Sequence, residues 1–272
     1  MRNKPIRSVC LVFNPQKLRA KEEIPKLKSW LSSQKVRVLS LSKLSKADAL
    51  ITLGGDGTIL SAAPKAAELN VPVLGINVGR LGFMTSMEMD EMYSELSDWR
   101  LGAWSLSERL MLEVKLSSQK QVSYALNDAV IRIGTTSRVI SVLASISGES
   151  LGRFTGDGLI IATPTGSTAY SLSAQGPVVH PDLNALILTP ICPHGFTQKP
   201  VVFPSDKVVE LKLDTRREIG DVQLCLDGQK VFPLKESDRV TVKPSKMRLK
   251  LFHKPSVSYF NVLREKLSWG EN

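Results

Sequence analysis

The residues best suited to chemistry lie together in Gly54-Gly55-Asp56-Gly57-Thr58, directly after the apolar run Leu50–Leu53. Glycines let a ligand approach the backbone closely. Their N–H groups, with those of the first turn of a helix expected over Ser61–Leu69, can face a phosphate. A carboxylate repels phosphate, so Asp56 makes sense if it accepts a proton from a hydroxyl or holds a metal between phosphates. The alternative is a Gly-Asp-Gly turn between a strand and a helix, a common use of these residues.

Four further polar segments follow later in the chain. Asn127-Asp128 interrupts a strand-like run and can bind ribose hydroxyls or make an Asx turn, and Asp157 lies in a second Gly-Asp-Gly turn. Thr163–Ser173 carries six Ser and Thr hydroxyls around Gly166, just past a strand and at the expected start of a helix. Helix capping explains one hydroxyl but not the cluster, which favours a nucleotide site. Asp227-Gly228-Gln229 reads as a hairpin turn.

The elements that position these residues differ between the two halves. In the first half, strands alternate with helices, which predicts a mainly parallel sheet covered on both faces. Ligands of such sheets bind beyond the carboxyl ends of the strands, where both Gly54–Gly57 and Asn77–Gly82 fall. The expected strands are Ile6–Phe13, Val36–Leu41, Asp48–Leu53 and Val71–Ile76, and the expected helices are Lys17–Ser33, Ser61–Leu69 and Asp90–Trp99.

From about Ser107 the sequence alternates in strand fashion and helical periodicity is scarce, which predicts a mostly antiparallel β domain. Phe260–Trp269 returns to helical periodicity and is expected to pack back on the first domain. The fold class is therefore α/β + β: a Rossmann-like α/β domain over residues 1–104, joined by about 256–272, and a β-rich domain over 105–255. The expected strands here are Leu110–Leu116, Val122–Ile133, Val139–Ile146, Gly158–Thr163, Val208–Leu213, Val222–Leu226 and Arg239–Lys243.

Composition restricts the class of protein. The 272 residues carry a net charge of +10, with no dense basic run and no nucleic-acid module, so a nucleotide or polyphosphate ligand suits the charge better than DNA does. No apolar run could span a bilayer, and the basic start lacks a signal-peptide cleavage pattern, so we expect a cytoplasmic protein without membrane contact. The three distant cysteines make neither a disulfide framework nor a zinc pattern.

Several familiar sites are missing from the sequence. There is no Gly-x-x-x-x-Gly-Lys-Ser/Thr loop, no Gly-x-Gly-x-x-Gly after the first strand and no Gly-x-Ser-x-Gly elbow. The three histidines have no metal-ligand spacing. P-loop enzymes, ordinary dinucleotide-binding dehydrogenases and hydrolases of the elbow type are therefore disfavoured.

The chain resembles the bacterial NAD kinases because it carries four motifs in the order found in that family: Gly54–Thr58, Asn77–Phe83, Asn127-Asp128 and Thr163–Ser173. The similarity covers nearly the whole chain, including Pro190–His194 and the tail Tyr259–Leu263. Lipid kinases and phosphofructokinases share the Gly-Gly-Asp-Gly loop, but Thr-Pro-Thr-Gly-Ser-Thr-Ala-Tyr is much more specific to NAD kinases.

The resemblance implies transfer of the ATP γ-phosphate to the 2′-hydroxyl of the adenosine ribose of NAD, which gives NADP. By similarity, Asp56 is the catalytic residue that accepts the proton of that hydroxyl. The residues implied to bind NAD are Asp56, Gly57, Asn127, Asp128, Arg138, Asp157, Thr168, Ala169, Tyr170, Ser171, Leu172, Ser173 and Gln229. Those suggested for phosphate or ATP are Gly54, Gly55, Thr58 and Arg80. The family also implies a divalent metal, Mg²⁺, held mainly by substrate phosphates, and a homodimer or homotetramer.

One position departs from the family pattern. Thr155 stands where relatives often have a basic residue, so a phosphate contact is either absent or supplied by Arg153 or Arg138.

Three alternative functions are a lipid or sugar kinase with the same glycine loop, a non-catalytic NAD-binding sensor and a nucleic-acid binder. The sequence leaves open whether ATP, another nucleoside triphosphate or polyphosphate is the donor, whether NAD or NADH is preferred, and how NADP or NADPH regulates the enzyme.

Overall fold

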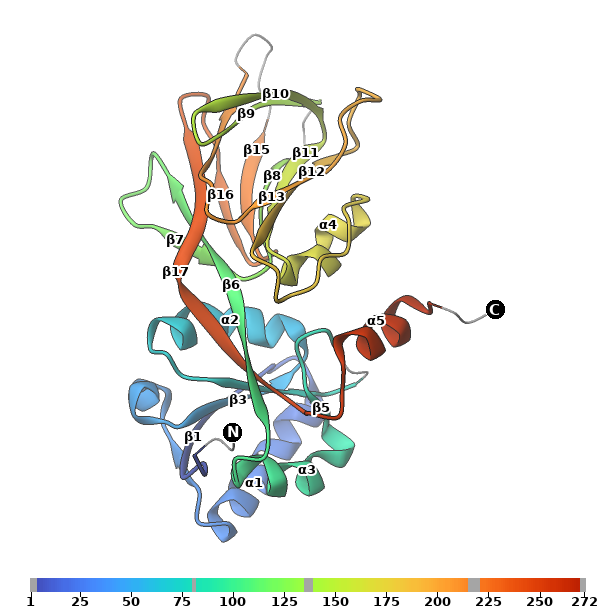
Figure 1. The fold of residues 1–272 in the computed structure, drawn as a ribbon. Helices are drawn as coiled ribbons and strands as arrows, with labels where there is room; N and C mark the ends of the chain where they lie inside the picture. Colours follow the sequence, from blue (N-terminus) through green and yellow to red (C-terminus); the bar gives the residue numbers. More distant parts are fainter. Residues whose placement is uncertain (1–3, 80–81, 135–138, 215–220, 270–272) are drawn as a thin grey trace. The chain divides into compact units, whose positions relative to one another are not determined.

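The chain forms two compact units in a computed structural model, which describes residues 4–79, 82–134, 139–214 and 221–269 (Figure 1). The first unit comprises Met1–Glu108 and Met247–Asn272, and the second comprises Arg109–Lys246. The chain passes from one unit to the other within strand β6 (Ser105–Leu116) and returns within strand β17 (Arg239–His253). The functional domain boundaries expected near residues 104 and 255 stay a prediction.

The first unit is built on a parallel sheet in the order β2-β1-β3-β4-β17. In its register, Leu11 lies opposite Ile51, and Gly54 lies opposite Asn77. Its strands are β1 (Ser8–Phe13), β2 (Arg37–Leu39), β3 (Ala49–Gly54), β4 (Val73–Asn77) and β5 (Met87–Glu88). Its helices are α1 (Leu18–Ser33), α2 (Asp56–Glu68), α3 (Met92–Arg100) and α5 (Tyr259–Leu267), with 3₁₀ turns at Leu41–Lys46 and Met89–Glu91.

Helices cover both faces of this sheet, as the alternating pattern predicts. The buried faces of α1 and α3 pack with β1, β3 and β4 in one apolar cluster, while α2 packs on the other side (Figure 1). In that cluster, Trp99 meets Phe252 edge to face, with ring centroids 5.4 Å apart. Helix α5 belongs to the same compact unit and buries Leu263, which confirms that the C-terminal helix returns to the first half of the fold.

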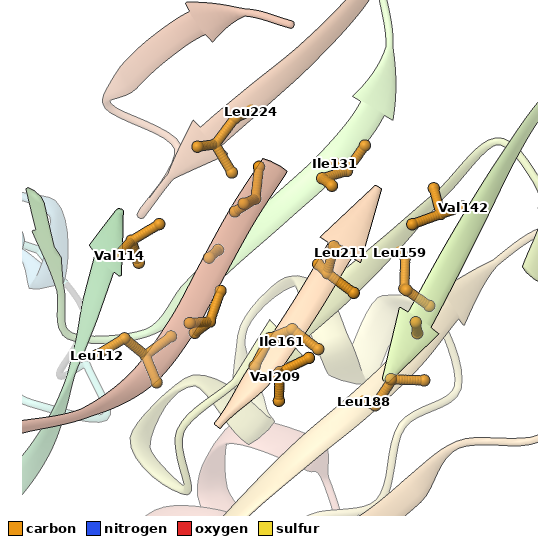
Figure 2. Close-up of a cluster of buried hydrophobic side chains, with 14 of the residues drawn as sticks. Leu112, Val114, Ile131, Val142, Leu159, Ile161, Leu188, Val209, Leu211 and Leu224 are labelled. Atoms are coloured by element: carbon orange, nitrogen blue, oxygen red, sulfur yellow. The ribbon is translucent and has the colours of Figure 1, made fainter. Parts of the chain in front are cut away.

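The second unit is a β-sandwich. One sheet has the order β13-β12-β11-β8-β15-β16, and the other contains β10-β9-β14-β17 with β6 and β7; the strand pairs within the unit are antiparallel. Alternate residues such as Leu159 and Ile161 of β11 point into the core between the sheets (Figure 2). Its other elements are β7 (Ser123–Ala125), β8 (Asp128–Ile133), β9 (Ile140–Ile146), β10 (Glu149–Gly156), β11 (Gly158–Ala162), β12 (Ala185–Ile191), β13 (Val201–Pro204), β14 (Val209–Leu213), β15 (Val222–Leu226), β16 (Lys230–Pro233) and α4 (Tyr170–Ser173).

The predicted fold class, α/β followed by antiparallel β with a C-terminal helix, is confirmed, and several element bounds are corrected. Helix α2 begins at Asp56 rather than Ser61, so Gly57 and Thr58 lie in its first turn. Strand β17 continues to His253, well past the expected end at Lys243. Strands β10, β12, β13 and β16 were not predicted. In the described part of the chain, even the longest helix, α1 with 16 residues, is too short and too polar to span a bilayer.

Candidate functional site

The Gly-Gly-Asp-Gly segment lies where the order of the parallel sheet reverses. Strand β1 leads through α1 to β2 on one side, and the chain then crosses to β3 on the other side. In open α/β sheets, ligands bind at such switch points, outside the carboxyl ends of the strands. Strand β3 ends at Gly54, and Asp56 opens α2, where the positive end of the helix dipole favours a carboxylate.

The Asp56 carboxylate is held by backbone N–H groups from the segment after β4. Oδ2 accepts from Phe83 N at 2.9 Å, while Oδ1 accepts from Met84 N at 3.1 Å and Thr85 N at 3.3 Å. An ionised carboxylate offers about four lone-pair positions, so the three bonds from described residues leave one position on Oδ2. Asp56 is only partly buried. The arrangement fixes the carboxylate and keeps one acceptor position for a hydroxyl.

We call the three backbone N–H groups that hold the Asp56 carboxylate its cradle, and the lack of a side chain at Gly82 leaves room for it. A Cβ at Gly82 would lie 2.2 Å from Asp56 Oδ1, so any side chain there would displace the carboxylate. The glycine is fixed by Thr85 Oγ1, which accepts from Gly82 N at 2.7 Å and from Asn77 Nδ2 at 3.3 Å. Gly82, the last residue of the predicted Asn77–Gly82 loop, thus lies directly against Asp56 of the Gly54–Gly57 segment.

Lys17 brings a positive charge to the same strand ends, a role that the sequence pattern does not indicate. Its Nζ donates to Gly54 O and Val78 O, each at 2.9 Å. The side chain therefore ties the ends of β3 and β4 together from the start of α1. The only local signal was the Asn14-Pro15 turn just before it, which does not show where the ammonium group points.

The four candidate phosphate residues have different surroundings. A Cβ at Gly54 would lie 2.0 Å from Thr58 Oγ1, so Gly54 is required by the fold itself. Thr58 is buried, whereas Gly55 is partly exposed with an extended backbone. A Cβ at Gly57 would meet no described atom within 4 Å, so there is room for a side chain at this position. Arg80 lies outside the described residues.

In the second unit, a second carboxylate collects three backbone N–H groups. Asp227 Oδ2 accepts from Leu126 N at 2.8 Å, and Oδ1 accepts from Asn127 N at 2.7 Å and Asp128 N at 3.1 Å. Asp227 and Gly228 both have positive φ, 52° and 66°, and form the expected hairpin turn between β15 and β16. The sequence indicated the turn but not that its carboxylate organises the link between β7 and β8.

The opposite side of that link is held by the segment after β11. Thr163 N donates to Asn127 O at 2.8 Å, and Thr163 Oγ1 donates to Leu126 O at 2.6 Å. A Cβ at Gly166 would lie 2.1 Å from Asn127 O, so the two segments touch through backbone. The start of the predicted Thr163–Ser173 segment therefore lies against the predicted site residue Asn127.

Two buried polar atoms beside this contact have no partner in the described structure: Asn127 Oδ1 and Thr165 Oγ1. Buried polar groups are normally hydrogen-bonded, so such orphans indicate a missing ligand or water. Asp128 is buried too, with 4% of its surface exposed. Burial, with the nearby charge of Asp227 as the second cause, raises the pKa of Asp128 to about 7. Burial also raises the pKa of Asp227, against the effect of its three N–H donors.

Most hydroxyls of Thr163–Ser173 are used by the fold. Ser167 Oγ donates to Pro164 O at 2.6 Å, Thr168 Oγ1 donates to Thr165 O at 3.3 Å, and Ser171 Oγ bonds Thr189 Oγ1 at 2.9 Å. The segment forms a 3₁₀ turn at Thr165–Thr168 followed by the four-residue helix α4, so a short helix does begin here. Tyr170 is 40% exposed, and Ser173 is exposed; Ala169 and Leu172 are partly exposed.

Asp157 lies at the other end of β11, about 20 Å along the strand from Thr163 at 3.3 Å per residue. It is the single residue between β10 and β11, at the point where the chain changes sheets, rather than part of a free turn. Its carboxylate accepts a hydrogen bond from the Cys192 thiol, which raises the pKa of that thiol. Tyr170, which follows the opposite end of β11, nevertheless interacts electrostatically with both Asp157 and Asp128.

The neighbourhood of Thr155 narrows the choice of a substitute for the missing basic residue. Thr155 Oγ1 bonds Ser141 Oγ at 2.8 Å. Arg153 pairs with the buried carboxylate of Asp214 at 2.9 Å, so its charge is already neutralised. Arg138 lies outside the described residues. Gln229 is exposed at the end of the Asp227 turn. Within the described ranges, no three His, Cys, Asp or Glu side chains are grouped to hold a metal ion.

Known proteins match the chain over most of its length. The family described as "ATP-NAD kinase N-terminal domain" matches residues 42–100, and "ATP-NAD kinase C-terminal domain" matches residues 126–254. The NAD kinase of Sulfurimonas denitrificans is 36% identical over 288 residues, covering 100% of both chains. Among solved structures, yeast NADH kinase complexed with NADH has a TM-score of 0.86 at 25% identity, covering 98% of this chain and 89% of that one.

An NAD kinase from Archaeoglobus fulgidus in complex with ATP has a TM-score of 0.79 at 26% identity, covering 96% of this chain and 98% of that one. Sequence and fold thus agree over both units, and the residues that suggested the resemblance lie at the strand ends described above. The chain belongs to the NAD kinase family.

Proposed function

We propose that the chain transfers the γ-phosphate of ATP to the 2′-hydroxyl of the adenosine ribose of NAD. The observation that carries this proposal is the Asp56 carboxylate, fixed by three backbone N–H groups with one acceptor position left on Oδ2. Binding alone gains little from a carboxylate beside phosphates. A hydroxyl that must lose its proton needs such a group within hydrogen-bond reach.

Asp56 would act as the general base. The ribose hydroxyl donates to Oδ2, and its proton passes to the carboxylate as the hydroxyl oxygen attacks the γ-phosphorus and the bond to the β-phosphate oxygen breaks. General-base assistance contributes roughly 10²–10⁴-fold. Positioning and neutralisation of phosphate charge supply most of the remaining acceleration in phosphoryl transfer. The fixed backbone donors keep the base from rotating away between turnovers.

Recognition of NAD is assigned to the second unit. The unpartnered Asn127 Oδ1 and Thr165 Oγ1 suit ribose hydroxyls, and Asp128 lies beside them. The other expected NAD-binding residues stay proposals with this assignment: Gly57, Arg138, Asp157, Thr168, Ala169, Tyr170, Ser171, Leu172, Ser173 and Gln229. Two solved relatives support the ligand pair, since one was determined with NADH and another with ATP.

The phosphate donor is proposed to meet the open start of α2. Gly57 leaves space there, and Lys17 supplies a positive charge at the adjacent strand ends; Gly55 and Arg80 remain candidates. Mg²⁺ binds through one or two carboxylates together with substrate phosphates, so a dedicated cluster of protein ligands is not required. When bound, Mg²⁺ would neutralise phosphate charge.

The remaining expectations accompany this proposal. A homodimer or homotetramer and a cytoplasmic location stay predictions from the family resemblance and the sequence. Polyphosphate stays an alternative donor. A lipid or sugar kinase is disfavoured by the family membership. A non-catalytic NAD sensor would not need the cradle that holds Asp56.

The test is NADP formation from NAD and Mg-ATP by the purified protein, compared with Asp56→Asn. We expect kcat to fall by about 10²-fold or more in the variant, because the amide cannot take the proton, while NAD binding by calorimetry changes little. The matched control is Asp48→Asn. Asp48 also accepts two backbone N–H groups in the first unit, from Arg7 and Ser8, but lies elsewhere in the sheet. Near-normal turnover in Asp56→Asn would exclude the general-base role.

A further inference from the structure

The link between β7 and β8 is hydrogen-bonded on both sides. The Asp227 carboxylate accepts from the backbone N–H groups of three consecutive residues, Leu126 to Asp128. Thr163 donates to the backbone carbonyl groups of Leu126 and Asn127. The Asn127 backbone therefore has both its donor and its acceptor in use. Its side-chain Oδ1 is left buried and unpartnered, which points to a ligand.

Asp227 reaches this link only because its own backbone is unusual. At φ 52° it lies in the left-handed region, which among non-glycine residues favours Asn and Asp. Gly228, at φ 66°, completes the turn, and Gln229 N closes it on Leu226 O at 2.9 Å. The turn also contacts the link directly, since Asp227 N donates to Asp128 O at 3.1 Å. The carboxylate and the turn backbone thus fix one strand junction together.

We propose that Asp227 is a positioning residue for NAD: its carboxylate sets the backbone of Leu126–Asp128, so that the Asn127 and Asp128 side chains meet the dinucleotide. This inference rests on the proposed function. Asp227 itself need not touch the substrate, because all three of its acceptor contacts go to backbone N–H groups. Its substitution should therefore weaken NAD recognition more than it slows phosphoryl transfer.

The carboxyl groups of Asp227 and Asp128 also interact electrostatically. The charge of Asp227 contributes to raising the pKa of Asp128 to about 7, after burial. Other titratable groups whose charges interact with Asp128 are Tyr170 and Cys225, and Lys230 faces Asp227. If ionised Asp128 accepts from a ribose hydroxyl, NAD affinity should fall as pH drops through about 7. Removing the charge of Asp227 should move that transition to lower pH.

The experiment is a graded series, Asp227→Asn and Asp227→Gly, in the full-length protein. Both replacements suit positive φ, so the turn is kept. Asn retains one carbonyl oxygen and Gly retains no acceptor. Because hydrogen bonds to a charged group are among the stronger ones, we expect KM for NAD to rise about tenfold in Asp227→Asn and further in Asp227→Gly. We expect kcat to stay within about threefold, since Asp56 is untouched.

The matched control is Asp238→Asn. Asp238 is another buried carboxylate of the same unit, which accepts from Lys235 N at 2.9 Å and Ser117 Oγ at 3.2 Å. A general loss of stability would affect both residues, whereas only Asp227 should change KM for NAD and the pH at which kcat/KM falls. Thermal melts of every variant accompany the kinetics.

The outcomes separate this inference from the proposed function. If the wild-type protein makes no NADP, the proposed function fails, and calorimetric NAD binding by the same variants still tests Asp227. If the wild-type protein is active and Asp227→Gly keeps both its KM and its pH profile, Asp227 is not a positioning residue. A loss confined to kcat, or an equal rise of KM in Asp238→Asn, would also overturn the inference. A graded rise of KM with a shifted pH profile supports it.

Discussion

Asp56 and Asp227 use the same local device in different surroundings. Each carboxylate accepts three consecutive backbone N–H groups, from Phe83 to Thr85 in the first unit and from Leu126 to Asp128 in the second. Asp56 opens a helix, and a Cβ built at the neighbouring Gly57 would meet no described atom within 4 Å. Asp227 sits in a hairpin turn beside a second, buried carboxyl group.

The difference shows how one device can serve two purposes. Where the held carboxylate keeps an open acceptor position, the N–H groups orient the carboxylate for chemistry. At Asp227 the residues that it contacts carry the unpartnered polar atom, Asn127 Oδ1, so here the carboxylate orients the backbone of Leu126–Asp128 and with it the Asn127 and Asp128 side chains. Substitutions that affect kcat at one site and KM at the other would make this distinction measurable.

The largest expected effect comes from closing the cradle of Asp56. In Gly82→Ala, the new methyl group would lie within 2.2 Å of Asp56 Oδ1 and must displace the carboxylate. We expect kcat to fall by about 10²-fold, as for loss of the base, with a destabilisation of about 1–3 kcal/mol from overpacking. Steady-state kinetics and a denaturant titration measure both. Full activity in a folded Gly82→Ala protein would show that the observed Asp56 position is not the working one.

An intermediate effect is expected from neutralising Asp128. Its folded-state pKa of about 7 lies above the ordinary value of 3.8, so the stability it contributes is present below about pH 4 and lost as pH rises through about 7. Asp128→Asn removes this loss. The free energy of unfolding of the variant, relative to wild type, should rise by up to about 4 kcal/mol between pH 4 and pH 8.

Urea titrations at a series of pH values test this, and NAD binding should weaken in the same variant. An unchanged pH dependence of stability would mean that Asp128 is not held in a desolvated environment. It would also contradict the proposed effect of the Asp227 charge on the pKa of Asp128.

The smallest effect on stability is expected at Gly57. A Cβ there meets no atom within 4 Å, and the residue lies in the first turn of α2. Gly57→Ala should leave the free energy of unfolding unchanged or raise it by about 0.4–1 kcal/mol. If a substrate approaches this backbone as proposed, kcat/KM should nevertheless fall several-fold. Unaltered kinetics would remove Gly57 from the substrate-binding set.

Short sequence patterns predicted the elements that depend on neighbouring residues alone. The buried strands β1, β3 and β4 and the glycine-rich strand end were visible as apolar runs followed by turn residues. The start of α2 was missed because Gly57 is a poor helix former, and burial of Thr58 and Ile59 overrides that propensity. The long β17 was cut short at Lys243 because Pro244 follows it.

The roles of the site residues depend on contacts between distant parts of the chain. Asp227 lies about a hundred residues from Leu126, Asn127 and Asp128 in sequence, so the Asp-Gly pair indicated a turn and nothing more. The hydroxyls of Thr163–Ser173 looked like one ligand-binding cluster, yet only the β12 strand, itself unpredicted, reveals that Ser171 bonds Thr189. Which polar atoms remain free for a ligand is therefore known only from the folded structure.

The second unit is one uninterrupted stretch of chain, while the first is assembled from two stretches that lie before and after it. During synthesis on the ribosome, all residues of the second unit emerge before Met247–His253 can add the last strand beside β4. The unit that would recognise NAD can therefore be complete while the sheet beneath Asp56 still lacks a strand. The order of synthesis makes the unit that holds Asp56 the last to be finished.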